Sequence, residues 1–138
     1  MSESLDKIKV TIEDAYNNGN LDRLNDIYDP NAVRHTNSTR DLIGLDAIKK
    51  AVANMQQANP DMSFSLDEVF EVGDKRAIRW VQQGTNTATG KVWRNTGSAI
   101  CHLVDGKVIE EWNSFDLLGM FQQLGLVAPT EELTARNS

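Results

Sequence analysis

The first part of the chain repeats hydrophobic residues at the spacing of one helix face. Over residues 3–18 the apolar positions lie three or four apart, which predicts an amphipathic helix. The same spacing predicts a short second helix capped by Asn20 and a third helix over about residues 45–58. Asn59-Pro60 ends the third helix, because the residue before a proline avoids the helical conformation. Between the second and third helices, residues 32–36 are predicted to be a short extended piece.

After residue 61 the alternation of apolar and polar residues is that of strands. Asp105-Gly106 predicts a tight hairpin, because both central residues of a type I′ turn need a positive φ. The alternation slips at Val69, which indicates a bulge. A terminal helix is predicted over residues 117–125, and residues 130–138 are expected to be a loose tail. The predicted strands form an antiparallel meander and span residues 62–72, 75–85, 91–104 and 107–116.

Helices followed by strands predict an α+β fold. We expect residues 1–138 to form one domain, with three N-terminal helices packed on a strongly curved, mainly antiparallel sheet. Bulges would bend this sheet into a cone around the helices. The hollow of the cone would then be the natural pocket for a small ligand.

Charge narrows the class of partner. The 138 residues carry 14 Lys and Arg against 20 Asp and Glu, a net charge of −6. Basic side chains are not clustered, so nucleic acids and anionic membranes are not expected partners. A small, neutral or weakly charged organic ligand is favoured. The single cysteine and the lack of an apolar run of membrane-spanning length predict a cytoplasmic protein.

Strong cofactor and nucleophile motifs are missing from the sequence. It has no G-x-G-x-x-G, no P-loop and no G-x-S-x-G. His35 and His102 are the only histidines, and no Cys or His pair has metal-ligand spacing. We therefore expect neither cofactor nor metal. The remaining polar groups suit proton-transfer chemistry.

Three segments together resemble the SnoaL-like polyketide cyclase family of the NTF2-like superfamily. They are AYNNGNLDRLNDIYDPNAVRH, NPDMSFSLDEVFEVGDKRAIRWVQQGT and VDGKVIEEWNSFDLLGMFQQLG. The last is the most specific, with a D-G-K turn, an E-x-W strand, an Asp and then Q-Q-L-G. The resemblance covers about residues 5–126. It implies a cone-shaped α+β fold and a homodimer that pairs through the outer face of the sheet, where Leu103 or Ile109 would be exposed.

The resemblance implies that Asp116 is the general acid/base of an intramolecular aldol closure. A carboxyl in a dry pocket can take the proton of an acidic C–H group and return one to the alkoxide. From the residues alone, the N-cap of the following helix is the favoured role of Asp116. His102 matches a histidine beside the acid in related cyclases, although a strand histidine is often only a core residue.

Four further residues are candidates for substrate binding. They are His35, Tyr16, Trp80 and Trp112. The phenol of Tyr16 lies on the inner stripe of the first helix and could reach the pocket. The tryptophan rings would suit a planar substrate, but they could also fill the core. His35 could contact the substrate or lie exposed in a loop.

An unbroken hairpin would keep the two catalytic candidates apart. A two-residue turn at Asp105-Gly106 places His102 opposite Ile109, on the face of the odd-numbered residues of the last strand. Asp116 would then point to the other face. The two side chains can meet only through an irregularity, expected between Trp112 and Asp116, or if Asp116 lies beyond the last paired residue.

The sequence thus favours an enzyme that closes a ring in a small polyketide-like carbonyl compound without a cofactor. Two alternatives remain open. One is a non-catalytic ligand-binding or dimeric scaffold domain of the NTF2-like superfamily. The other is a different lyase, isomerase or hydrolase that uses the same pocket.

Overall fold

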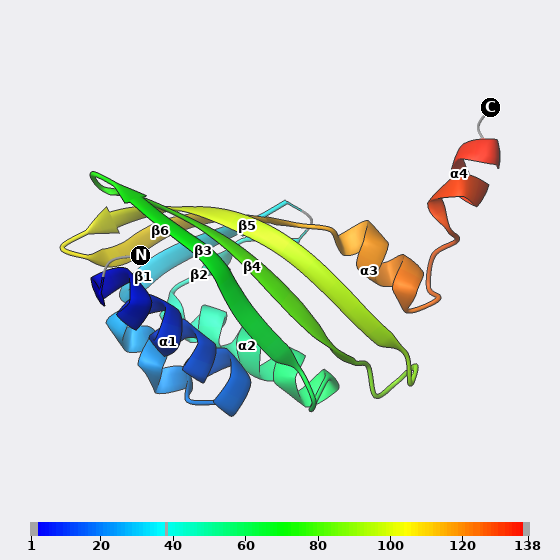
Figure 1. Ribbon diagram of the computed structural model, residues 1–138, viewed down its shortest axis with the longest axis horizontal. Helices are drawn as coiled ribbons and strands as arrows, with labels where there is room; N and C mark the ends of the chain where they lie inside the picture. The colour runs from blue at the N-terminus through cyan, green and yellow to red at the C-terminus, as the bar shows by residue number, and fades with distance from the viewer. Residues whose placement is uncertain (1–2, 38, 137–138) are drawn as a thin grey trace.

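The structure, a computed structural model, describes residues 3–37 and 39–136 and has its N-terminal helices on one side of a single sheet, with the C-terminal helices beyond the end of the strands (Figure 1). The helical elements are α1 (Glu3–Asn18), the 3-10 helix η1 (Leu21–Asp26), α2 (Leu45–Ala58), α3 (Leu117–Gln123) and α4 (Thr130–Arg136). The strands are β1 (Tyr28–Thr36), β2 (Leu42–Ile43), β3 (Ser63–Val72), β4 (Lys75–Thr85), β5 (Val92–Val104) and β6 (Lys107–Phe115).

Within the described residues, the sheet has six strands in the order β2-β1-β6-β5-β4-β3. The predicted meander is present as β3 to β6, with antiparallel pairing throughout. The predicted extended piece is part of the longer strand β1, which pairs with β6 in parallel. The fold is therefore α+β with a mixed, mainly antiparallel sheet.

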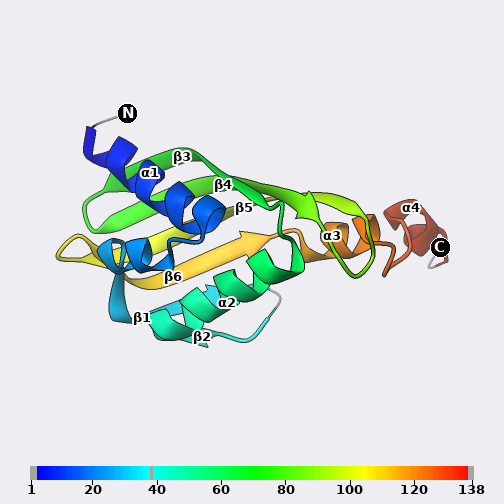
Figure 2. The ribbon, with the colours of Figure 1, turned by 90° about the horizontal axis from the view of Figure 1, so that it is seen from below.

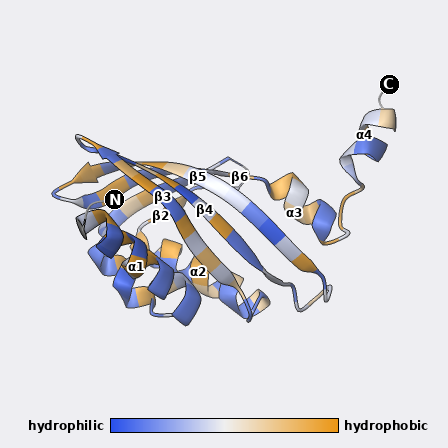
Figure 3. Ribbon diagram, viewed as in Figure 1, coloured by the Kyte–Doolittle hydropathy of each residue, from blue (hydrophilic) through white to orange (hydrophobic). Residues whose placement is uncertain are grey.

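Helices α1 and α2 cover the same face of the sheet, which we call the inner face (Figure 2). Helix α1 contacts β3, and α2 contacts β1 and β2. Along the strands, hydrophobic and hydrophilic residues alternate (Figure 3), as a sheet with one covered face requires. The inner face and the helices share a core that includes Ile12, Leu24, Ile48, Leu66 and Val108.

One expectation about the helices needs correction. The second helix is a 3-10 helix, and Asn20 makes no capping hydrogen bond with its side chain. The segment expected to be a loose tail contains α4, whose first turn has hydrogen bonds to α3. The side-chain nitrogen of Gln122 donates to the carbonyl of Ala128 and to the hydroxyl of Thr130, each at 3.0 Å. No helix within the described residues is long and apolar enough to cross a membrane.

The hairpin and the first bulge agree with the sequence. Asp105 and Gly106 have φ of 51° and 79°, as a type I′ turn requires. In β3 the register with β4 shifts between Leu66 and Glu68, close to the slip seen at Val69.

A second bulge lies early in β6. Leu103 pairs with Val108, but His102 pairs with Glu110, so Ile109 is the extra residue. From Glu110 onward this insertion reverses which residues of β6 face the helices. The ladder between β5 and β6 ends at Phe115, one residue before Asp116.

Candidate functional site

A cavity of about 390 Å³ lies between the inner face of the sheet and the helices. Most of its wall is apolar and comes from elements far apart in the sequence: Phe64 from β3, Trp80 from β4, Met55 from α2 and Phe121 from α3. The volume is within the range of small-molecule sites. The cavity can therefore hold a small, largely apolar ligand.

A buried polar cluster forms one part of the cavity wall. The guanidinium of Arg34 binds the carboxylate of Glu111, with Nε 2.5 Å from Oε2. The hydroxyl of Tyr28 donates to the other oxygen of Glu111 at 2.7 Å. Nη2 of Arg34 donates to the hydroxyls of Tyr28 (2.9 Å) and Tyr16 (3.3 Å). These four residues, which we call the Arg34 cluster, all line the cavity.

Strand pairing creates this cluster. In the parallel β1–β6 ladder, Arg34 lies opposite Glu111, and both side chains point to the inner face. Arg34 and Glu111 retain only 8% and 2% of their accessible surface. Buried charges need partners of this kind, because burial without one costs several kcal/mol.

Electrostatics keep Arg34 charged. Burial acts to lower its pKa, but the negative charge of Glu111 and the nearby phenols outweigh burial and hold the pKa well above its usual value. Burial raises the pKa of Tyr28 well above 10, and the charge of Glu111 adds to this effect. Tyr28 therefore stays protonated and Arg34 stays cationic across the physiological pH range.

Amide side chains add further hydrogen-bond donors to the cavity. The indole Nε1–H of Trp80 donates to Oδ1 of Asn113 at 3.2 Å. An indole nitrogen can only donate, so Asn113 must offer its oxygen to Trp80 and keeps its NH₂ group for other partners. Asn95 also lines the cavity, and its Oδ1 accepts from the backbone N–H of Thr96 at 3.0 Å. Both amides thus leave donors for oxygen atoms of a ligand.

The position of Trp80 depends on Gly97, its partner on β5. A Cβ atom at Gly97 would overlap the indole ring and lie 2.7 Å from the carbonyl oxygen of Ser114. The ring of Trp80 therefore lies directly over the backbone of β5. This close approach sets one wall of the cavity.

Asp116 is the N-cap of α3. Its Oδ1 accepts a hydrogen bond from the backbone N–H of Gly119 at 2.9 Å. Its side chain is exposed and does not line the cavity, although both chain neighbours, Phe115 and Leu117, do. The carboxylate therefore lies next to the cavity and stabilises a helix end.

The prediction that His102 and Asp116 share one site is wrong. His102 is on the outer face, where its Nε2 lies 3.0 Å from Oδ2 of Asp74. Asp116 does lie beyond the last paired residue, as one alternative predicted. The irregularity, however, occurs at Ile109 rather than between Trp112 and Asp116, and it leaves His102 on the face away from the cavity.

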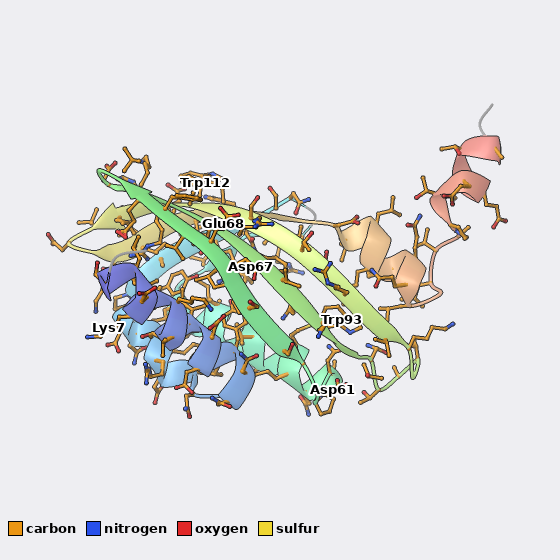
Figure 4. The ribbon with its side chains drawn as sticks, in the orientation of Figure 1. Lys7, Asp61, Asp67, Glu68, Trp93 and Trp112 are labelled. Atoms are coloured by element: carbon orange, nitrogen blue, oxygen red, sulfur yellow. The ribbon has the colours of Figure 1, made fainter. Side chains whose placement is uncertain are left out.

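Two of the four substrate-binding candidates line the cavity. These are Tyr16 and Trp80. His35 and Trp112 instead lie on the outer face, where their rings stack with centroids 5.5 Å apart. Figure 4 shows Trp112 on the side of the sheet away from the helices. Neither can contact a ligand in the cavity, because the sheet lies between.

Carboxylates hold His35 on both sides. Its Nε2 lies 2.6 Å from Glu110, and its Nδ1 lies 2.9 Å from Asp41. The hydrogen bond to Glu110 raises the pKa of His35 above 6.5 despite some desolvation, and Asp41 adds to the rise.

Sequence reasoning missed Arg34, Tyr28 and Glu111. One signal was available for Arg34: it shares the alternation of β1 with the fully buried Ala32, so the two point the same way. No comparable signal marked Glu111, because the bulge at Ile109 breaks the alternation before it. In the part of the chain that the structure describes, no group of three or more His, Cys, Asp or Glu could hold a metal ion.

Comparison of the sequence with known protein families gives a match. The family model of the SnoaL-like polyketide cyclases matches residues 7–124. No curated protein matches the chain significantly.

Solved structures agree with the family match. TsrD from Streptomyces laurentii is 22% identical, with a TM-score of 0.81 over 92% of this chain and 99% of that one. A proposed polyketide cyclase from Bacillus cereus ATCC 10987 is 27% identical, with a TM-score of 0.75 over 86% of this chain and 78% of that one. A protein from Catenulispora acidiphila with a ketosteroid isomerase-like fold, 13% identical, has a TM-score of 0.75 over 86% of this chain and 92% of that one. The chain therefore belongs to the SnoaL-like polyketide cyclase family and has the NTF2-like fold.

Proposed function

We propose that this protein closes a ring in a small polyketide-like carbonyl compound by an intramolecular aldol reaction, without a cofactor. One observation carries the proposal: the cavity combines apolar, aromatic walls with hydrogen-bond donors from the Arg34 cluster and the amides. A poly-carbonyl chain presents the complementary surface, because its oxygens are acceptors and its carbon skeleton is apolar. Family membership supports the same reaction class.

The reaction needs a group that moves one proton. A base removes a proton from the carbon between two carbonyls, the resulting carbanion attacks a distant carbonyl carbon, and the new alkoxide regains a proton. We assign this role to Asp116, which lies between two residues of the cavity wall. Its Oδ1 accepts the capping hydrogen bond from the N–H of Gly119, while its Oδ2 accepts no hydrogen bond from residues 3–37 or 39–136. No catalytic role is assigned to His102.

Replacement of Asp116 by Asn tests this assignment. Asn caps a helix about as well as Asp, so the fold should remain, but the titrating proton is lost. With a panel of linear poly-β-ketone esters, we expect the ring-closure rate to fall by a factor on the order of 10² or more. Chromatography with mass detection reports the product, which has the mass of the substrate or that mass less one water.

The matched control is Asp105→Asn at the hairpin turn between β5 and β6. It makes the same chemical change at a residue with positive φ, which Asn tolerates well. The control should close rings at the wild-type rate. Full activity in Asp116→Asn would remove Asp116 from the mechanism.

A non-catalytic ligand-binding domain is the second candidate function, and one observation favours it. Among the described residues that line the cavity, Glu111 is the only one with a carboxylate, and its charge is compensated by Arg34. A wild-type protein that binds the esters but leaves them unchanged would favour this alternative.

We also propose a homodimer that pairs through the outer face of the sheet. Leu103 was expected on this face but is a buried core residue, and Ile109 lies in the bulge. An apolar row crosses the strands instead, formed by Phe70, Ala77, Ile100 and Trp112. Phe70, Ile100 and Trp112 are each at least 45% exposed.

The charged groups around this row already have partners within the chain. Arg79 binds Glu68, His102 binds Asp74, and His35 binds Glu110. A second copy could therefore cover the row without burying an unpaired charge, and exposed apolar surface favours such a contact.

Sedimentation equilibrium tests the dimer. At micromolar concentration the wild type should have about twice the 15.4 kDa mass of one chain. Ile100→Glu places a charge in the middle of the row and should give monomers. Ser65→Glu, on the same face but away from the row, should leave the dimer intact. A monomeric wild type would refute the proposal.

A further inference from the structure

We infer that Tyr16 and Arg34 form an oxyanion site that binds the enolate oxygen of a 1,3-dicarbonyl ligand, with Glu111 as the residue that positions Arg34. This inference rests on the proposed function, because it assigns the substrate class of the same cavity. It follows from which hydrogen-bonding groups in the Arg34 cluster already have partners and which do not.

The two tyrosines of the cluster differ in how they use their protons. Both hydroxyl oxygens accept a hydrogen bond from Nη2 of Arg34. Tyr28 then donates its own proton to Glu111 at 2.7 Å. The hydroxyl of Tyr16 finds no acceptor among the described residues, although it belongs to the cavity wall. Tyr16 therefore has a proton to offer to a ligand, and Tyr28 does not.

Arg34 also has a donor left over. Nε binds Glu111, and Nη2 binds the two phenols. Nη1 donates to no residue in the described part of the chain. Since Arg34 lines the cavity, Nη1 and the Tyr16 hydroxyl can both act on one ligand oxygen. The hydrogen bond from Arg34 polarises the Tyr16 hydroxyl and makes it a stronger donor.

The free donors of the cluster favour an oxygen that becomes negative. Arg34 and Glu111 together are neutral, so the ion pair itself presents no net charge to a ligand. A 1,3-dicarbonyl can enter the cavity neutral and lose its proton there. The Tyr16 hydroxyl and Nη1 of Arg34 can then stabilise the enolate oxygen, and they do so more than the neutral carbonyl, because hydrogen bonds to a charged acceptor are stronger.

Aromatic rings next to Tyr16 suit the shape of an enolate. The Tyr16 ring stacks on Phe64 with centroids 4.3 Å apart, and Phe64 in turn lies 6.0 Å from Trp80. Trp80 then lies 6.3 Å from Phe115. A conjugated enolate is flat, so an aryl dicarbonyl can place its oxygen at Tyr16 and its ring along this aromatic wall.

Binding of 1-phenylbutane-1,3-dione tests the inference without any catalytic step. Its neutral and enolate forms differ in ultraviolet absorption, so a pH titration of the bound compound gives its pKa. The wild type should lower this pKa relative to water. Tyr16→Phe should remove roughly one to two pH units of that shift, the effect of one hydrogen bond to a charged acceptor.

A double variant tests Arg34 without leaving a buried charge. Arg34→Gln with Glu111→Gln removes both members of the ion pair, and it should also reduce the shift. The matched control is His35→Gln with Glu110→Gln, which makes similar changes at the neighbouring positions on the outer face. The control should keep the wild-type shift. Circular dichroism would establish that each variant is folded.

The outcomes separate this inference from the proposed function. A folded Tyr16→Phe variant that binds and ionises the dione like the wild type would overturn the inference, even if the wild type closes rings. Failure of the wild type to bind the dione would overturn it as well. A wild type that lowers the pKa of the dione but closes no ring would support the inference and refute the proposed function.

Discussion

Strands β1 and β6 carry one ion pair on each face of the sheet, at neighbouring positions. Arg34 binds Glu111 on the inner face, and His35 binds Glu110 on the outer face. The side chains of the inner pair are 10% and 3% exposed, whereas those of the outer pair are 29% and 38% exposed. The pairs share strands, register and similar distances. They differ in burial and in the cation, which is an arginine on the inner face and a histidine on the outer face.

Burial changes what an ion pair contributes. A buried pair needs both members, because the loss of one leaves a charge that water cannot solvate. An exposed pair adds little to the stability of the fold, since water already solvates each member. The inner pair should thus govern stability and ligand chemistry, and the outer pair should adjust stability only slightly.

The largest effect is expected from Glu111→Gln. This change leaves the Arg34 cation without its carboxylate and should lower the free energy of unfolding by about 3 kcal/mol. Glu110→Gln, one residue earlier on the same strand, should change it by less than about 1 kcal/mol. Urea denaturation of both variants measures the contrast. Equal losses would show that burial does not distinguish the two pairs.

A smaller effect is expected from Gly97→Ala, which acts on the inner face without any change in charge. The added methyl group would overlap Trp80 and force the indole away from β5. Overpacking of this kind should cost about 1–3 kcal/mol. Thermal unfolding followed by tryptophan fluorescence would detect both the loss and the altered ring environment. Ser98→Ala, the adjacent outer-face position, is the control and should be nearly neutral.

The smallest effect concerns pH and the outer pair. The pKa of His35 is raised above its unfolded value of 6.5, mainly by Glu110. Its contacts should therefore stabilise the fold fully below about pH 6.5 and lose this contribution as the pH rises through the folded pKa. Wild type and His35→Gln, compared by urea denaturation at about pH 6 and about pH 8, should differ more at the lower pH. Parallel pH profiles would argue against a protonated His35.

The same urea denaturation at two pH values should give a different result for the inner pair. Because Glu111 and the nearby phenols hold the pKa of Arg34 well above its usual value, its charge does not change over this range. The cost of Glu111→Gln should therefore be the same at both pH values. A cost that varied with pH would indicate that another group of the cluster titrates.

Much of the fold could be predicted from local patterns. The helix over 3–18, the helix over 45–58 and the strand over 75–85 have the predicted bounds, because each is long and strongly periodic. Strand β1 was underestimated, since Pro30 and its neighbours resemble a stop signal. Its parallel pairing with β6 joins residues more than 70 positions apart, which no local pattern reveals.

The candidate site was harder to predict for a related reason. Tyr16 and Trp80 could be placed, because a helix face and a regular strand determine their directions. His102 could not be placed, since its partner depends on a one-residue bulge. Sequence analysis did not single out Arg34 or Glu111, because only the pairing of β1 with β6 gives each the partner that permits burial.

The bulge at Ile109 absorbs one extra residue of β6, so that the residues after it keep their faces relative to β5. With the extra residue in place, Glu111 faces the cavity and Trp112 faces the outer surface. In a chain that lacked Ile109, the later residues would keep their faces and the strand would lose its bulge. Deletion of one residue between Glu110 and Phe115 would instead move every later side chain of the strand to the opposite face of the sheet. Natural changes in the length of β6 are therefore expected at Ile109, where one residue can be lost without exchanging the two faces.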